Sequence, residues 1–272
     1  MGEFFGFGGY QRPIEGYFSW QHIAFVTCFM VVMVTAAILL GKQNRHKSVA
    51  EKNKVIIWSA ILIDSFEILK IVIMCIRGKD PMGWITELPL FLCSIQLITI
   101  PLAAFSKGRV KEAALDFVFI FGILGAVLGT YLAGNNYGSY PVLSFDNTVS
   151  AITHSISGFT SLYIVISGME SMKKKNIPIT FAILLSFAVS AYIANVLIPY
   201  NYMFLMRGDG TPYDILYNIV NGNKVIYPIL VVVLFMLYIF AFWGVYTIIK
   251  AKTQKRKASI EAIAYEQVEV TT

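Results

Sequence analysis

The sequence predicts an all-α, polytopic membrane protein with seven transmembrane helices, with its N-terminus outside and its C-terminus in the cytoplasm. Three observations lead to this fold class: the apolar content, the length of the apolar stretches, and the distribution of lysine and arginine between them. Hydrophobic residues make up 57% of the 272 residues and charged residues only 14%, whereas soluble domains carry about 25% charged residues. This composition excludes an ordinary soluble enzyme domain.

Seven apolar stretches are long enough to cross a bilayer as helices, since a span needs about 20 mostly apolar residues. The candidate spans are residues 20–41, 55–77, 84–106, 112–133, 148–170, 178–199 and 225–249. The chain therefore divides into an extracellular or interfacial N-terminal segment (1–19), a seven-helix transmembrane domain (20–249) and a mobile cytoplasmic tail (250–272).

Positive charge alternates from one loop to the next. Sixteen lysines and arginines lie in the loops and tail on one side of the spans, and five lie on the other side. Cytoplasmic loops carry the excess of lysine and arginine, so the first set is expected inside the cell. The net charge of +6 suits contact with anionic lipid headgroups, and no nucleic-acid-binding motif is present. We expect a multi-pass protein of the cell membrane.

The three cysteines, Cys28, Cys75 and Cys93, all fall within candidate spans. Their positions suggest neither a disulfide framework nor a zinc site. The sequence also lacks a nucleotide-binding loop and a flavin fingerprint. We therefore expect no cofactor and no metal, and the sequence does not define an oligomeric state.

The second span contains three ionisable residues, Asp64, Glu67 and Lys70, at spacings that place them along one side of a helix. Charged groups at this depth normally face the bundle interior or a wet cavity and pair with one another. Two interpretations stay open: a structural Glu67–Lys70 pair that fixes helix packing, and a role in a functional site.

The third span carries Glu87 near its outer end and Pro89 shortly before Cys93. A proline loosens a helix because it lacks the N–H donor. Cys93 and Gln96 are three residues apart and are expected on one helix face. A single membrane cysteine is most often a small buried apolar residue, so Cys93 needs a partner before it suggests chemistry.

The fifth span offers such a partner in His154. A polar helical stripe runs along this span through Asn147, Ser150, His154, Ser157 and Ser161. Small hydroxylated residues let membrane helices approach closely, which accounts for the serines but not for the histidine. At 1.5 Å per residue, Cys93 and His154 lie about 13 Å and about 9 Å below the outer surface. The two side chains therefore lie at the similar depth that a shared site in the outer half of the membrane requires.

Other polar residues lie just above this layer. Asn195 is in the outer turn of the sixth span, and Asn201, Tyr202 and Arg207 follow it. Arg207 is either a phosphate-binding arginine, since guanidinium forms fork-like hydrogen bonds, or an ordinary loop residue. In the fourth span, the GxxxG pair Gly125 and Gly129 signals close helix packing.

Four motifs carry a family resemblance: FSWQHI (18–23), LPLFLCSIQ (88–96), THS (153–155) and NYMFL (201–205). Together they resemble the YwaF-like family of bacterial integral membrane proteins. That family is distantly similar to a eukaryotic transmembrane acyltransferase that remodels ether phospholipids, thought to use an intramembrane cysteine with a histidine partner. The resemblance implies Cys93 as nucleophile. The family commonly has a histidine where this chain has Phe91, which leaves His154 as the base.

Three functions compete. In the first, the protein acts on a membrane lipid as an acyltransferase or acyl hydrolase, with Cys93 attacking an ester, His154 as base, and Asn195 or Asn201 steadying the oxyanion. The polar network around them comprises Asp64, Glu67, Lys70, Glu87, Gln96 and Asn195, and the headgroup is bound by Asn201, Tyr202 and Arg207. In the second, the protein is a small-molecule or proton-coupled transporter whose intramembrane charges form a relay. In the third, it is a non-catalytic receptor or scaffold.

Overall fold

The computed structural model describes the backbone of residues 2–271 and the side chains of residues 2–256 and 259. All regular secondary structure in these residues is helical, which confirms the all-α class. The elements are α1 (Trp20–Asn44), α2 (Val49–Gly78), η1 (Gly83–Glu87), α3 (Gln96–Phe105), α4 (Gly108–Tyr131), α5 (Gly134–Ser139), α6 (Phe145–Ser167), η2 (Lys174–Asn176), α7 (Ile177–Leu197), η3 (Tyr202–Phe204), α8 (Tyr213–Ile219) and α9 (Ile226–Thr271).

Within the described chain, five helical segments are long and apolar enough to cross a membrane. They are Trp20–Asn44, Gly108–Ser139, Phe145–Ser167, Lys174–Leu197 and Ile226–Arg256. Two of the seven expected spans do not meet these criteria. The first is α2, which is 30 residues long but carries Asp64, Glu67 and Lys70 in its middle. The second is the expected third span, which is interrupted.

The prediction of one continuous helix over 84–106 is wrong. The 3₁₀-helix η1 ends at Glu87, and α3 begins only at Gln96. Leu88, which precedes Pro89, has extended backbone angles (φ −56°, ψ 142°), as expected because proline disfavours helical geometry in the residue before it. Cys93 therefore lies in the turn that leads into α3 and not on a helix face shared with Gln96.

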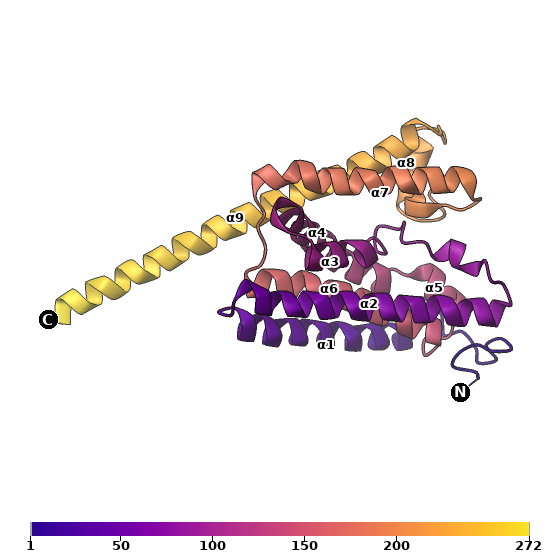
Figure 1. The fold of residues 1–272 in the computed structure, drawn as a ribbon, viewed down its shortest axis with the longest axis horizontal. Coiled ribbons are helices and arrows are strands. Elements are labelled where there is room, and N and C mark those ends of the chain that lie inside the picture. The colour runs from indigo at the N-terminus through magenta and orange to yellow at the C-terminus, as the bar shows by residue number, and fades with distance from the viewer. Residues whose placement is uncertain (1, 272) are drawn as a thin grey trace.

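Helices α1, α2, α6 and α7 run along one direction, α4 and α9 are inclined to them, and α4 and α6 lie at the centre (Figure 1). Helices α1 and α2 pack on α6 on one side, and α7 and α9 lie on the other side with α3 and α4 between the two groups. The N-terminal segment lies at one end of the bundle, and α9 leaves it at the opposite end. The α9 helix continues to Thr271, so residues 250–271 extend it; their mobility stays a prediction.

The contact between α4 and α6 explains the Ser157 and Ser161 part of the polar stripe on α6. A Cβ added to Gly122 would lie 2.8 Å from both the Ser157 carbonyl oxygen and the Ser161 Cβ. The Ser161 hydroxyl donates to the Phe119 carbonyl at 2.8 Å. These small residues let the two helix backbones approach closely, and their hydroxyl groups are satisfied by backbone carbonyls. This agrees with the packing interpretation of the serines.

Candidate functional site

A cavity of about 530 Å³ lies between the second half of α2, the interrupted segment 86–97, α5, the first half of α6 and the loop 200–209. It is at the end of the bundle where the N-terminal segment lies (Figure 1). Cys93 and His154 both line it. The break in the third expected span is what opens this space, because residues 88–95 turn where a helix would otherwise continue.

Cys93 is placed by the turn before α3. It lies in the turn of residues 91–95 that leads into Gln96. The Ser94 hydroxyl stabilises the turn by accepting from the Phe91 N–H at 3.0 Å and donating to the Phe91 carbonyl at 3.1 Å. On its other side Cys93 rests on α4, where a Cβ added to Gly125 would lie 3.7 Å from Cys93 Cα and Cβ.

His154 is oriented by its own helix. Its Nδ1 lies 2.7 Å from the Ser150 carbonyl oxygen. A carbonyl only accepts hydrogen bonds, so the proton sits on Nδ1 and Nε2 carries the free lone pair. The ring lies over Gly129 of α4, because a Cβ added there would overlap Nε2 and Cδ2 of the imidazole.

The two side chains line the same cavity. Gly125 and Gly129, on which they rest, are one helical turn apart on the same face of α4. With Nδ1 bound to Ser150, the nitrogen left to take the thiol proton is Nε2. The arrangement can generate a thiolate inside the bundle.

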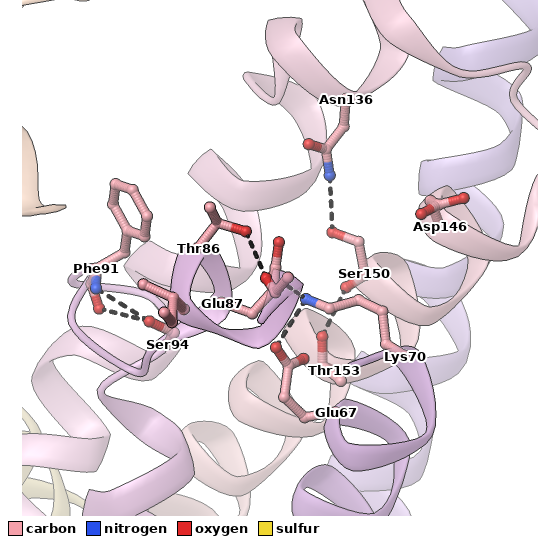
Figure 2. A network of polar contacts seen from close by, with 12 residues as sticks. Glu67, Lys70, Thr86, Glu87, Phe91, Ser94, Asn136, Asp146, Ser150 and Thr153 are labelled. Carbon is pink, nitrogen blue, oxygen red and sulfur yellow. Dashed lines mark hydrogen bonds and ion pairs between the residues drawn. The ribbon is translucent and has the colours of Figure 1, made fainter. Parts of the chain in front are cut away.

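Next to this pair, Lys70 is clamped between two carboxylates. Its Nζ lies 2.7 Å from Glu67 Oε1 and 2.8 Å from Glu87 Oε2, and Figure 2 shows the ammonium between them. All three residues line the cavity. Asp64, expected in the same network, lies one turn before Glu67 on α2, is half-buried and is not part of the cavity wall. Of the three charged residues in the middle of α2, only Glu67 and Lys70 therefore line the cavity.

Three of the predicted site residues brace the fold instead of lining the cavity. Gln96 is fully buried and accepts from the Thr99 hydroxyl at 3.1 Å. Asn195 exchanges two hydrogen bonds with the backbone of Tyr202, at 2.9 Å and 2.7 Å. The Tyr202 hydroxyl donates to the Ile85 carbonyl, which ties the loop after α7 to η1.

Asn201 and Arg207 do line the cavity. The Asn201 amide donates to the Arg207 carbonyl and to an Asp209 carboxylate oxygen, both at 2.8 Å. The exposed Arg207 guanidinium is paired with Asp209. Asn201 therefore shapes this loop, and a phosphate bound by Arg207 would have to compete with Asp209.

Phe91, which stands where the family pattern has a histidine, packs among aromatic rings. Its ring centroid lies 6.0, 5.5 and 5.8 Å from those of Tyr200, Tyr202 and Phe204. The position is filled by an aromatic cluster, and His154 is the histidine that lines the cavity.

The sequence did not reveal an ion pair beside the cavity, whose Asp146 lines the wall. Arg77 at the end of α2 binds Asp146 at the start of α6 through two bonds of 2.6 and 2.8 Å. The Tyr10 hydroxyl donates to the same carboxylate at 2.5 Å. Burial and this hydrogen bond raise the pKa of Tyr10 to about 12. No spacing rule links residues this far apart in the chain.

A further missed residue is Asn136 of α5, whose side chain donates to the Ser150 hydroxyl at 3.3 Å (Figure 2). That hydroxyl in turn lies 3.4 Å from His154 Nδ1. No group of three metal-ligating side chains occurs in the part of the chain whose side chains are described.

Residues 17–247 match a protein-family model, that of the TMEM164 family. The match covers α1 to α8 and most of the apolar part of α9, including every residue of the cavity wall. No curated protein and no solved structure matches the chain significantly.

Proposed function

Because this chain belongs to the TMEM164 family of membrane proteins, we propose that it acts on membrane lipids as a cysteine-dependent acyltransferase or acyl hydrolase. The observation that carries the proposal is that Cys93 and His154 line one cavity and rest on Gly125 and Gly129, one helical turn apart on α4. The resemblance to the YwaF-like family, and through it to a transmembrane acyltransferase, supports the same chemistry.

In the proposed mechanism, His154 Nε2 takes the proton from the Cys93 thiol, and the thiolate attacks the carbonyl carbon of a lipid ester. The tetrahedral intermediate collapses to a thioester, and the imidazolium gives its proton to the leaving alcohol oxygen. A second oxygen nucleophile then loses a proton to His154 and takes the acyl group from sulfur. The outcome is transfer when this nucleophile is a lipid hydroxyl and hydrolysis when it is water.

The N–H groups of Cys93 and Ser94 are the proposed oxyanion donors, because they belong to the turn that carries the sulfur. Asn195 and Asn201, considered for this role from the sequence, are engaged with the loop 201–209. Lys70 keeps one positive charge in the cavity, held between Glu67 and Glu87. The cavity offers polar groups to a lipid headgroup and glycerol, while acyl chains extend toward the bilayer.

The proposal includes seven crossings of the cell membrane, with the N-terminus outside. Helix α2 and the interrupted segment 83–105 are the two crossings added to the five apolar helical segments. Supporting this, the N-terminal segment and the projecting end of α9 lie at opposite ends of the bundle (Figure 1). The lysine and arginine bias then places the cavity in the outer leaflet. We also assign the chain to the bacterial, YwaF-like part of this sequence space.

The test is covalent labelling. Purified protein is treated with an acyl-phosphonate or alkynyl-lipid probe, and adduct formation is followed by gel and mass spectrometry. We expect labelling of wild type, loss of labelling in Cys93→Ala, and strong reduction in His154→Ala. Cys28→Ala and Cys75→Ala are matched controls that should label like wild type. Unchanged labelling in Cys93→Ala rules out the mechanism.

One observation favours a second function, transport. Lys70, Glu67 and Glu87 form an ion cluster inside the same cavity, and such groups serve as proton or ion relays in carriers. Proton-coupled solute uptake by vesicles containing wild type, but not by vesicles containing Glu67→Gln, would support this alternative. A receptor or scaffold role predicts neither uptake nor labelling.

A further inference from the structure

Gly129 occupies an unusual place relative to His154. A Cβ added to this glycine would overlap Nε2 and Cδ2 of the imidazole, closer than real Cβ atoms approach any neighbour. Gly129 lies inside α4 with ordinary helical backbone angles. Backbone conformation therefore does not require glycine here; the histidine ring does.

The ring cannot easily turn away from this seat. Its Nδ1 is held by the Ser150 carbonyl at 2.7 Å on the same helix, so the imidazole is confined between that carbonyl and α4. A methyl group at position 129 would push the ring off the Ser150 bond or push α4 away from α6. Either shift moves Nε2 relative to the Cys93 sulfur.

We propose that Gly129 is a positioning residue of the Cys93–His154 pair: its missing side chain is the seat that holds Nε2 against the thiol. The inference rests on the proposed function, in which these two side chains act together. The GxxxG motif of α4 then has a role beyond helix packing, because Gly125 contacts Cys93 and Gly129 contacts His154.

Gly122, Gly125 and Gly129 of α4 meet different neighbours, which supplies matched controls. Gly125 tolerates a Cβ, since the nearest atoms of Cys93 would be 3.7 Å away, an ordinary contact. A Cβ on Gly122 would meet Ser157 and Ser161 at 2.8 Å, so Gly122→Ala disturbs the α4–α6 packing without touching the histidine. Only Gly129→Ala disturbs the ring itself.

The first measurement is a thermal double-mutant cycle on the full-length protein in detergent. Gly129→Ala is expected to lower the melting temperature by about 4 °C or more when His154 is present. In a His154→Ala background, where the space is free, the same change should have little effect. Gly122→Ala should lower the melting temperature equally in both backgrounds. If Gly129→Ala does not fold alone, recovery of folding in the double variant gives the same result.

The second measurement is alkylation of Cys93 by N-ethylmaleimide as a function of pH, in a Cys28→Ser, Cys75→Ser background. A nearby imidazole makes a thiol reactive at lower pH. We expect Gly129→Ala to slow labelling near neutral pH about tenfold, as His154→Ala does, corresponding to one pH unit in the midpoint. Gly244→Ala in α9, where an added Cβ meets no atom within 4 Å, should keep the wild-type profile.

The two measurements distinguish failure of the inference about Gly129 from failure of the proposed function. An equal loss of melting temperature from Gly129→Ala in both backgrounds overturns the inference, as does a wild-type labelling profile in a folded Gly129→Ala variant. If wild type and His154→Ala label identically, the imidazole does not activate Cys93 and the proposed function loses its base. The thermal cycle then still decides whether Gly129 seats the ring.

Discussion

Lys70 of α2 and Glu87 of η1 form an ion pair at 2.8 Å, which ties the interrupted segment to the wall of the cavity. Lys70 pairs at the same time with Glu67 on its own helix. Both carboxylates therefore depend on one ammonium group, and the cluster keeps one surplus negative charge. This ion pair connects the charged middle of α2 to the interrupted segment beside it.

Replacing Lys70 by methionine is expected to lower the free energy of unfolding by about 3 kcal/mol, because two largely buried carboxylates lose their counter-charge. Chemical or thermal unfolding in detergent measures this. Lys173→Met is the control: Lys173 pairs with Glu112 at 2.6 Å, but its side chain is 47% exposed, and such pairs contribute about 1 kcal/mol or less. Equal losses in the two variants would contradict the prediction.

Arg77 anchors the N-terminal segment, since its guanidinium donates both to Asp146 and to the Phe5 carbonyl at 3.2 Å. Arg77→Lys keeps the charge but removes the two-pronged geometry. We expect amide hydrogen exchange in residues 2–15 to become about tenfold faster, because bonds to charged groups contribute about 1.5–3 kcal/mol. Arg12→Lys, whose contact with Glu15 is 3.9 Å and largely exposed, should leave exchange unchanged.

Docking of the N-terminal segment should weaken at strongly alkaline pH. The pKa of Tyr10 is raised from 10.0 to about 12, mainly by burial and then by the hydrogen bond to Asp146. A raised pKa means that the docked state favours the neutral phenol. Its stabilisation is full below about pH 10 and is lost as the pH rises toward 12. The difference in phenolate absorbance between wild type and Tyr10→Phe should titrate near 12; a midpoint near 10 would show that Tyr10 is free.

Asn195 is predicted to hold the loop after α7, since it both donates to and accepts from the backbone of Tyr202. Asn195→Ala leaves the buried Tyr202 N–H unpaired, which costs about 1–3 kcal/mol, and removes one of two hydrogen bonds to the Tyr202 carbonyl, which also accepts from the Leu205 N–H. Hydrogen exchange in residues 198–209 should increase strongly. Asn218→Ala, at an exposed position on α8, is the control. Loss of probe labelling without any change in exchange would instead point to a direct role of Asn195 in catalysis.

Much of the architecture could be predicted because hydropathy is a local property. A run of apolar residues must be helical in lipid, where every backbone group needs an internal partner, so the spans at α1, α4, α6, α7 and α9 follow from composition. The break between Glu87 and Gln96 was only hinted at by Pro89. Whether a proline bends, loosens or ends a membrane helix depends on what fills the space beside it, here the aromatic cluster around Phe91.

The candidate site was predictable in part by depth along each helix. Counting residues placed Cys93 and His154 at similar depth, and both line the cavity together with Glu67 and Lys70. Asp64 and Gln96 were included because of helical spacing, but α3 begins only at Gln96 and Asp64 lies outside the cavity wall. Asn195 and Tyr202, expected just above this layer, pair with each other instead.

The sequence by itself determined the helical membrane class, most span positions and the charge asymmetry, because each depends on residue type and spacing alone. Tertiary structure decided which polar residues line one cavity. Gly125 and Gly129 of α4 lie beside Cys93 and His154, and Arg77 binds Asp146 across the bundle. Such contacts join distant parts of the chain, and only the packing of complete helices sets their geometry.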